Sequence, residues 1–180
     1  MNDTTLSIGV ILGSVREGRK GEPIARWVMD LLGTRTEAVA ELLDLRDFDP
    51  SFTQRWPQRI GAHDAFVIVT PEYNHGYPGT LKNALDASYA PWNDKPVAFV
   101  SYGFSASGAR AIEQLRQVTS ELRMMPIRDE VNLRLGSFRT DDRGFPTDER
   151  SLQRAGDVMT ELLFWGRLLK EGRSRRPARN

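Results

Sequence analysis

The sequence contains no cysteine and only two histidines, His63 and His75. The absence of thiols excludes disulfides, thiolate nucleophiles and cysteine-based metal sites, and it fits a reducing compartment. Two histidines also exclude a histidine-rich metal site, and the G-x-S-x-G sequence of hydrolase nucleophile elbows does not occur. Any redox chemistry in this chain therefore depends on an organic cofactor.

A strong charge of either sign is also lacking, because 25 lysines and arginines are balanced by 24 aspartates and glutamates, for a net charge of +1. Phosphate-driven binding usually shows as a clearly basic face, so nucleic acid is not expected as a partner. No segment has the apolar length of a membrane span, and the beginning, MNDTTLSIGVILG, lacks the basic head and long apolar run of a secretory signal. We therefore expect a cytoplasmic protein with no membrane partner.

The apolar residues follow two periodicities in turn along the chain. Strands are predicted over residues 6–13, 38–45, 64–70, 95–103 and 130–135, and the run at 6–13 is continuously apolar, which is typical of a strand buried on both faces. The second of these segments also suits a helix. Apolar residues at helical spacing predict helices over 24–32, 81–89, 111–122 and 152–169.

This alternation of strand and helix is typical of a doubly wound parallel sheet. Five strands fit the α/β flavodoxin-like order 2-1-3-4-5, a three-layer sandwich in which ligands bind at the carboxyl ends of the strands. One domain over residues 1–172 is expected, followed by a basic tail over 173–180. The segment 47–61, which includes Trp56, is expected to be a long irregular loop that covers a site or a partner subunit.

The loop after the first strand, GSVREGRKGEPI at residues 13–24, has the composition of an anion site. It opens a helix, whose first N–H groups and dipole favour negative charge. Ser14 supplies a hydroxyl, and positive charge comes from Arg16, Arg19 and Lys20. Gly18 and Gly21 let the backbone approach a ligand closely. A phosphate monoester fits this inventory, and a solvated basic turn fits this loop alone equally well.

The loop after the third strand, PEYNHGYPG at residues 71–79, combines stiff and permissive backbone. Pro71 and Pro78 fix the chain, while Gly76 and Gly79 allow close approach. Such a backbone can present its peptide groups to the edge of a planar heteroaromatic ring, with polar and aromatic support from Glu72, Tyr73, Asn74 and Tyr77. His75 has no partner carboxylate in view and is interpreted as a surface or packing residue rather than a catalyst.

The loop after the fourth strand, SYGFSASG at residues 101–108, is a flexible hydrogen-bonding turn before a helix. Ser107 suits the N-cap of that helix. Two acidic runs, DLRDFD at 44–49 and RTDDR at 139–143, are interpreted as solvated loops.

With these three loops in place, the chain resembles the NADPH-dependent FMN reductase family of flavodoxin-like flavoproteins, which includes quinone and azo-dye reductases. The matching stretches are GSVREGR, PEYNHGYPGTLKNALD and SYGFSASGARAIEQLR, in the family's order, and the middle stretch is the most specific. Two positions depart from the family: Gly76, where a small hydroxyl residue is common, and Ser107-Gly108, where two glycines are common.

The resemblance implies a bound FMN and a set of residues that hold it. Its phosphate would lie on Ser14, Arg16, Gly21, Glu22, Pro23 and Ile24. Its isoalloxazine would lie on Pro71, Glu72, Tyr73, Asn74, Ser101, Tyr102 and Gly103. His75 and Tyr77 are then candidates for substrate contact, and no side chain is expected as an acid–base catalyst.

The implied activity passes hydride from NADPH, or from NADH, through FMN to a small-molecule acceptor such as a free flavin, a quinone, an azo compound or a metal oxyanion. The resemblance also implies a homodimer or homotetramer, with the helix at 81–86 near the interface. The apolar stripe of the last helix, ending near Trp165, is compatible with such a contact.

Two alternatives remain. One is a flavodoxin-like electron carrier without a substrate of its own, against which the near-neutral charge counts; the other is an α/β domain that binds no flavin.

Overall fold

The computed structural model describes residues 5–48, 52 and 55–175. Its centre is a five-stranded sheet in the order β2-β1-β3-β4-β5, and every neighbouring pair of strands is parallel. The strands are β1 (Leu6–Leu12), β2 (Ala38–Asp44), β3 (Ala65–Pro71), β4 (Pro96–Gly103) and β5 (Met125–Arg134). The predicted flavodoxin-like fold and its strand order are confirmed.

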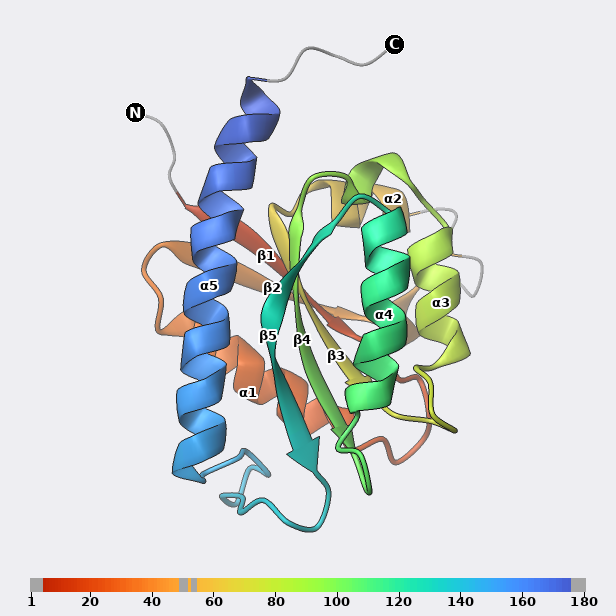
Figure 1. Ribbon diagram of the computed structural model, residues 1–180, viewed down its shortest axis with the longest axis vertical. Helices are drawn as coiled ribbons and strands as arrows, with labels where there is room; N and C mark the ends of the chain where they lie inside the picture. Colours follow the sequence, from red (N-terminus) through yellow and green to blue (C-terminus); the bar gives the residue numbers. More distant parts are fainter. Residues whose placement is uncertain (1–4, 49–51, 53–54, 176–180) are drawn as a thin grey trace.

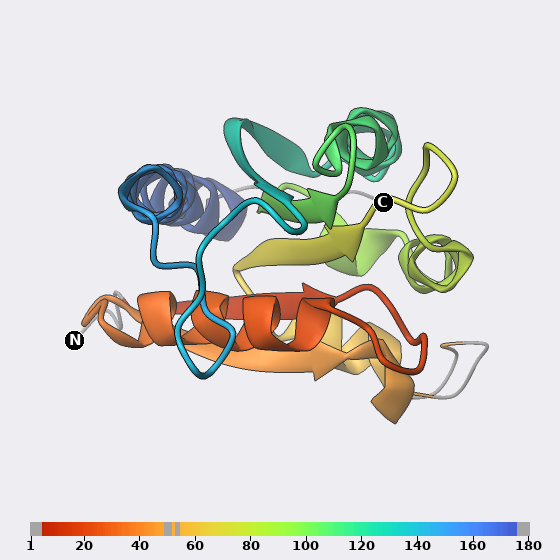
Figure 2. The same ribbon diagram turned by 90° about the horizontal axis from the view of Figure 1, so that it is seen from below.

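Helices cover both faces of the sheet, as Figures 1 and 2 show. One face carries α1 (Gly21–Gly33) and α5 (Glu149–Ser174). The other face carries α2 (Trp56–Gly61), α3 (Gly79–Asp86) and α4 (Ala109–Glu121). Two short 3₁₀ helices, η1 (Leu45–Asp47) and η2 (Ala90–Trp92), complete the elements among the described residues.

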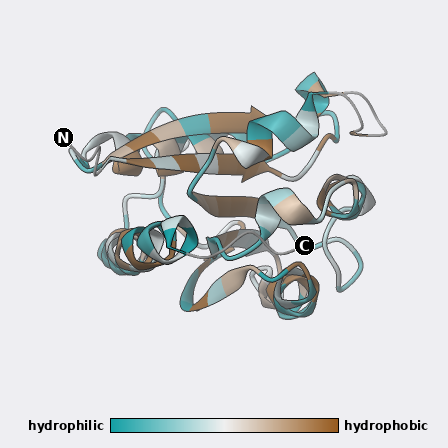
Figure 3. Ribbon diagram, turned by 90° about the horizontal axis from the view of Figure 1, so that it is seen from above, coloured by the Kyte–Doolittle hydropathy of each residue, from teal (hydrophilic) through white to brown (hydrophobic). Residues whose placement is uncertain are grey.

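The central strands are apolar along their whole length because both of their faces are covered. All residues of β3 and β4 are buried. Within β3, Val67 and Val69 face the core beneath α1 and α5, while Phe66 and Ile68 face the core beneath α3 and α4. This alternation is the two-residue period of a strand, and Figure 3 shows the sheet as the apolar layer between more polar helices.

The register of the sheet brings the ends of the strands to one edge. Leu12 is paired with Val69, Pro71 with Tyr102, and Gly103 with Arg134. The loops after β1, β3 and β4 therefore leave the sheet side by side, at the lower edge in Figure 1.

Arginines from the flanking helices donate hydrogen bonds to backbone carbonyl oxygens of the edge strand β5. Arg116 of α4 donates to the carbonyl oxygens of Ile127 and Arg128, both at 2.7 Å. Arg154 of α5 donates through Nε to the carbonyl oxygen of Glu130 at 3.1 Å.

The structure corrects the interpretation of residues 47–61 as an irregular loop. Residues 56–61 form α2, and Trp56 is fully buried in the core, edge-on to Phe52 and Trp92. Its indole Nε1 donates to the carbonyl oxygen of Ala84 at 2.7 Å. Trp56 therefore fixes α3 to the domain and does not cover a site; residues 49–51 and 53–54 lie outside the described part.

Three element boundaries also differ from the prediction. Helix α3 ends at Asp86, so Tyr89 lies beyond it and is exposed. Strand β5 begins at Met125, five residues before the predicted start at 130. Helix α5 runs to Ser174, and Arg173 forms an ion pair with Asp64 at 3.0 Å, so the first residues of the expected tail belong to the domain; residues 176–180 lie outside the described part.

Most of the apolar stripe of α5 is used within the subunit. Leu162 and Leu163 are buried against the sheet, and Trp165 packs on the same core. The exposed apolar side chains on this helix are Leu152, Phe164 and Leu168.

Candidate functional site

The three predicted loops meet at the carboxyl edge of the sheet through direct hydrogen bonds. The hydroxyls of Ser14 and Tyr73 are 2.8 Å apart and link the first loop to the second. The N–H of Glu72 donates to the carbonyl oxygen of Tyr102 at 3.0 Å and links the second loop to the end of β4. The prediction that these loops form one site is consistent with this geometry.

The start of α1 has hydrogen-bonding capacity that the described residues do not use. Its N-cap residue, Lys20, makes no side-chain cap hydrogen bond. The first N–H groups of a helix need a partner from outside the helix, and they point toward any anion placed there. The N–H of Ile24 closes the first turn on the carbonyl oxygen of the N-cap residue and Pro23 has no N–H, so the donors without an intrahelical partner belong to Lys20, Gly21 and Glu22.

The hydroxyl of Tyr102 lies at the same helix start. A Cβ added to Gly21 would stand 2.5 Å from Tyr102 Oη, so residue 21 has no room for a side chain. Tyr102 is only 3% exposed, and its Oη meets no hydrogen-bond acceptor among the described residues, although the N–H of Gly21 faces it. Burial, with the nearby Tyr73, raises the pKa of Tyr102 far above its usual value. The hydroxyl therefore stays protonated and can donate a hydrogen bond to a ligand.

Two of the predicted cations behave differently in the structure. Arg16 is exposed, its guanidinium lies 5.3 Å from the centre of the Tyr73 ring, and its N–H donates to Ser14 Oγ at 3.3 Å. The Arg19 side chain is 4% exposed and forms a two-point ion pair with Asp44. Most of the Arg19 charge is therefore neutralised within the protein, although its Nε is buried without a partner among the described residues.

The acidic run that begins at Asp44 is expected to be a solvated loop, but Asp44 is paired with Arg19. Burial opposes ionisation of Asp44, but the hydrogen bond and charge of Arg19 outweigh burial and hold the pKa of Asp44 below its usual value. Arg46 donates to the carbonyl oxygens of Val15 and Arg16. These contacts hold the loop at 13–20 over the end of the sheet.

The second loop contains a tight turn with strained residues. The backbones of Tyr73 and Gly76 exchange two hydrogen bonds, at 2.8 and 3.0 Å. Between them, Asn74 and His75 have φ values of +50° and +68°, in the left-handed region that side chains rarely adopt. Strain of this kind persists only where the surroundings fix it, and it is frequent at ligand sites.

Arg110 of α4 fixes this turn from outside. Its Nε lies 3.0 Å from Glu72 Oε1, and its N–H donates to Glu72 Oε2 at 3.3 Å. The same guanidinium contacts His75 Nε2 and Ser105 Oγ, so it joins the second loop to the third. Sequence reasoning missed Arg110, because Glu72 and Arg110 are 38 residues apart and no local pattern pairs them.

The third loop is shaped by one glycine. Gly108 has a φ of +93°, and an added Cβ would stand 2.4 Å from the side chain of Ser101. Ser101 Oγ donates to the carbonyl oxygen of Ser107 at 3.0 Å. The N-cap of α4 is Gly108, which corrects the assignment of Ser107 to that position.

The remaining predicted residues divide between the site and the core. Ile24 is buried in the core, so only its backbone faces the helix start. Glu22 pairs with Arg26 on the surface of α1. His75 is exposed on the strained turn, whereas Tyr77 is half-buried against the core, and burial raises its pKa.

Two absences concern the described part of the chain. None of its groups of histidine and carboxylate side chains could hold a metal ion. None of its helices is both long and apolar enough to cross a membrane.

The fold and the three loops define a flavodoxin-like α/β protein whose first helix starts without a side-chain cap at the carboxyl edge of the sheet. Residues 6–137 match the NADPH-dependent FMN reductase family, and the chain belongs to that family.

Relatives agree with this membership, and a solved structure shares the fold. The chain is 40% identical over 138 residues to an NAD(P)H-dependent FMN reductase of Schizosaccharomyces pombe, covering 67% of this chain and 68% of that protein. It is 28% identical over 179 residues to a 2-hydroxy-1,4-benzoquinone reductase of Burkholderia sp, covering 90% and 97%. The structure of FerB, a flavoenzyme NAD(P)H:(acceptor) oxidoreductase from Paracoccus denitrificans, has a TM-score of 0.74 at 22% identity, covers 90% of this chain and 97% of that one, and shares the fold.

Proposed function

We propose that this chain is an NAD(P)H-dependent oxidoreductase that uses FMN to reduce a small-molecule acceptor. Its membership in the family supports the cofactor and the activity. The observation that carries the proposal is the uncapped start of α1 beside the buried, unpartnered hydroxyl of Tyr102. A phosphate monoester supplies the acceptor oxygens and the negative charge that this place lacks.

The FMN phosphate is proposed to lie between the first loop and the helix start. The N–H groups of Gly21 and Glu22 and the hydroxyl of Tyr102 would donate to it, Pro23 would fix the first turn, and Ile24 would anchor that turn in the core. Ser14 is fully buried and bonded to Tyr73, so its hydroxyl supports the loop as well as facing the phosphate. Arg16, which forms no ion pair within the described residues, would supply the balancing charge.

The isoalloxazine is proposed to lie over the second loop, with the end of β4 on its other flank. The peptide groups of Pro71, Glu72, Tyr73 and Asn74 would meet the edge of the ring, and Ser101, Tyr102 and Gly103 would flank it. The two hydrogen bonds between Tyr73 and Gly76, together with Arg110, support this role because they hold those peptide groups in fixed directions. Preorganised dipoles of this kind need no rearrangement when charge develops on a ligand.

FMN, when bound, supplies the hydride chemistry, and the protein supplies position and electrostatics. No side chain is assigned as an acid or base. Glu72 is neutralised by Arg110 and positions the loop. His75, exposed on the turn, and Tyr77, half-buried below it, are proposed to contact the acceptor, which is a quinone, a free flavin, an azo compound or a metal oxyanion.

A cytoplasmic location and a homodimeric or homotetrameric state complete the proposal. The absence of cysteine supports the first. The exposed Phe164 and Leu168 on α5 support the second.

The deciding experiment is an absorbance spectrum of the purified protein, followed by anaerobic titration with NADPH. We expect FMN to copurify or to be taken up, and its absorbance to bleach within seconds of mixing. Adding a quinone should then restore the absorbance. A protein that binds FMN but is not bleached is an electron carrier, and one that takes up no FMN contradicts the proposal.

A further inference from the structure

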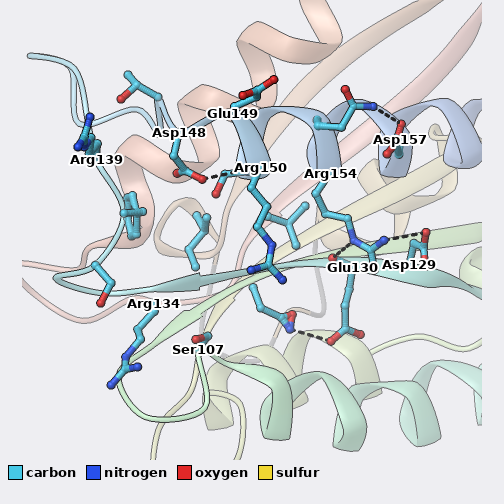
Figure 4. Close-up of a pocket in the computed structure, with 18 of the residues that line it drawn as sticks. Ser107, Asp129, Glu130, Arg134, Arg139, Asp148, Glu149, Arg150, Arg154 and Asp157 are labelled. Carbon is cyan, nitrogen blue, oxygen red and sulfur yellow. Dashed lines mark hydrogen bonds and ion pairs between the residues drawn. The ribbon is translucent and has the colours of Figure 1, made fainter.

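A groove along β5 borders the third loop on the side away from the second loop, and it holds charges of both signs. As many carboxylates as arginines line it. Figure 4 shows Arg154 of α5 bonded to Asp129, at 3.1 Å, and to the backbone of β5. Arg116 is paired with Glu130 at 2.6 Å. The groove therefore selects no ligand by its charge, and a more specific arrangement lies on the opposite side of the third loop, at His75.

The backbone and the ring of His75 are both fixed by α4. The φ value of His75 is +68°, and the side-chain amide of Gln114 donates to its carbonyl oxygen at 3.0 Å. Gly76 leaves room for that amide, because a Cβ there would stand 2.9 Å from Gln114 Oε1. The imidazole contacts Arg110, one helical turn before Gln114, and the same guanidinium bonds Ser105 of the third loop. The ring is thus connected to both loops that flank the proposed flavin.

The contact with Arg110 decides which ring nitrogen of His75 carries the hydrogen. Arg110 Nη1 is in hydrogen-bond contact with His75 Nε2. A guanidinium has only donors and stays charged in proteins, so His75 Nε2 accepts this bond. An imidazole that accepts at Nε2 is neutral and has its hydrogen on Nδ1. The side chain is exposed, and its Nδ1 meets no partner among the described residues, so the Nδ1–H is open to a ligand.

The location and the local charge of this N–H suit an uncharged electron acceptor. His75 directly follows Asn74, the last residue of the second loop that is proposed to meet the edge of the isoalloxazine. The charge of Arg110 is balanced by Glu72, which lies 3.0 Å away and is 10% exposed. The turn therefore offers one directed donor without a net positive charge. Such a donor stabilises negative charge that develops during a reaction, whereas an oxyanion favours a net cation.

We infer that the Nδ1–H of His75 donates a hydrogen bond to the oxygen of a quinone acceptor on which negative charge develops, and that Arg110 and Gln114 are the positioning residues of this donor. The inference rests on the proposed function. Hydride transfer gives the quinone two electrons and one proton, so that it becomes a hydroquinone monoanion while the reduced cofactor is oxidised. The second proton comes from water. His75 keeps its own hydrogen throughout and is not an acid.

The first test follows the return of flavin absorbance when quinone is mixed with the reduced protein. Loss of one hydrogen bond to the developing charge predicts reoxidation about tenfold slower in His75→Ala. Bleaching by NADPH should slow far less in this variant. A reoxidation rate equal to that of the unaltered protein overturns the inference.

Matched variants at the same position identify the nitrogen that acts. The amide N–H of asparagine lies near the position of imidazole Nδ1, and asparagine tolerates a positive φ. The amide of glutamine lies instead near the position of Nε2. His75→Asn should therefore retain most of the reoxidation rate, and His75→Gln should resemble His75→Ala. His75→Gly relieves the backbone strain without supplying a donor, so a rate equal to that of His75→Asn overturns the inference.

The second test needs neither FMN nor turnover. Nitrogen NMR of the isotopically labelled protein at alkaline pH distinguishes a ring nitrogen that carries hydrogen from one that does not. The chain has two histidines, so the signals missing from His75→Asn are those of His75, and His63 is the internal reference. We expect hydrogen on Nδ1 of His75, and a mixture of both forms in Arg110→Ala. Hydrogen mainly on Nε2 in the unaltered protein, or no change in Arg110→Ala, overturns the assignment.

The outcomes separate this inference from the proposed function. If NADPH bleaches bound FMN and quinone restores its absorbance equally fast in His75→Ala, the function stands and the role of His75 fails. If no FMN is taken up, or bound FMN is not bleached, the proposed function fails and the role of His75 falls with it.

Discussion

The hydroxyl of Tyr102 stands 2.5 Å from the point where a Cβ at residue 21 would lie, so the end of β4 determines which residue can begin α1. Leu12 of β1 is also close to that point, at 2.9 Å. Strand, helix and loop thus meet at one glycine. The helix start stays open to a ligand because no side chain fills it.

Gly21→Ala should destabilise the protein and weaken FMN binding, because the new methyl group overlaps the Tyr102 hydroxyl. Overpacking of this kind costs about 1–3 kcal/mol of unfolding free energy, measurable by urea denaturation. Gly33→Ala is the matched control, since no atom lies within 4 Å of its added Cβ. The double variant Gly21→Ala/Tyr102→Phe removes the nearest overlapping atom, and a cost equal to that of Gly21→Ala alone would refute this explanation.

Arg16→Ala should weaken FMN binding by about 1.5–3 kcal/mol, the range for a hydrogen bond to a charged group. The dissociation constant can be measured by quenching of flavin fluorescence. Riboflavin lacks the phosphate, so its affinity should not change in the same variant. An unchanged FMN dissociation constant would show that the phosphate lies elsewhere.

Arg110→Ala should loosen the strained turn, because the carboxylate of Glu72, only 10% exposed, loses its cation. We expect faster hydrogen exchange at the N–H groups of Tyr73 and Gly76, and weaker FMN binding by about 1–3 kcal/mol. Glu72→Gln in the same chain removes the unpaired charge and should recover part of the loss. Arg175→Ala breaks an exposed pair between the C-cap of α5 and Glu171, and it serves as the control.

His63 should make the protein sensitive to acid. Burial, reinforced by the charges of Lys95 and Arg59, lowers the pKa of His63 to about 4 from the usual 6.5. The facing Glu41 lies 3.4 Å away but is paired with Arg59, and Ser7 Oγ contacts the other ring nitrogen at 2.9 Å.

Between pH 4 and 6.5 the unfolded chain therefore binds more protons at His63 than the folded chain does. The free energy of unfolding should fall as the pH drops through this window, by up to about 3 kcal/mol. Urea denaturation at several pH values should show a smaller fall in His63→Gln. Equal pH profiles would mean that other groups dominate acid sensitivity.

The position of the site could be predicted from the sequence because it follows from topology. Parallel strands end at one edge, and three loops of unusual composition follow the strands that meet there. The partners of these loops could not be predicted in the same way. Arg110 and Asp44 act across the fold, and their pairing with Glu72 and Arg19 depends on how helices and strands pack.

Trp56 shows a different limit. Helix α2 has six residues, too few to show a helical period, and only Pro57 in its first turn signals a helix start. The burial of the indole depends on α3 and η2, which contribute Ala84 and Trp92 to its surroundings. The sequence of this short segment therefore predicts a loop, because the residues that bury Trp56 come from other parts of the chain.

The arginines that bind the carbonyl oxygens of Ile127, Arg128 and Glu130 also restrict how copies of this chain can associate. An open edge strand ordinarily invites an added strand, which leads to continuous sheets and aggregation. Here an incoming strand would have to displace Arg116 and Arg154 from acceptors that they already occupy, and break their ion pairs with Glu130 and Asp129. Assembly by extending the sheet past β5 is therefore disfavoured.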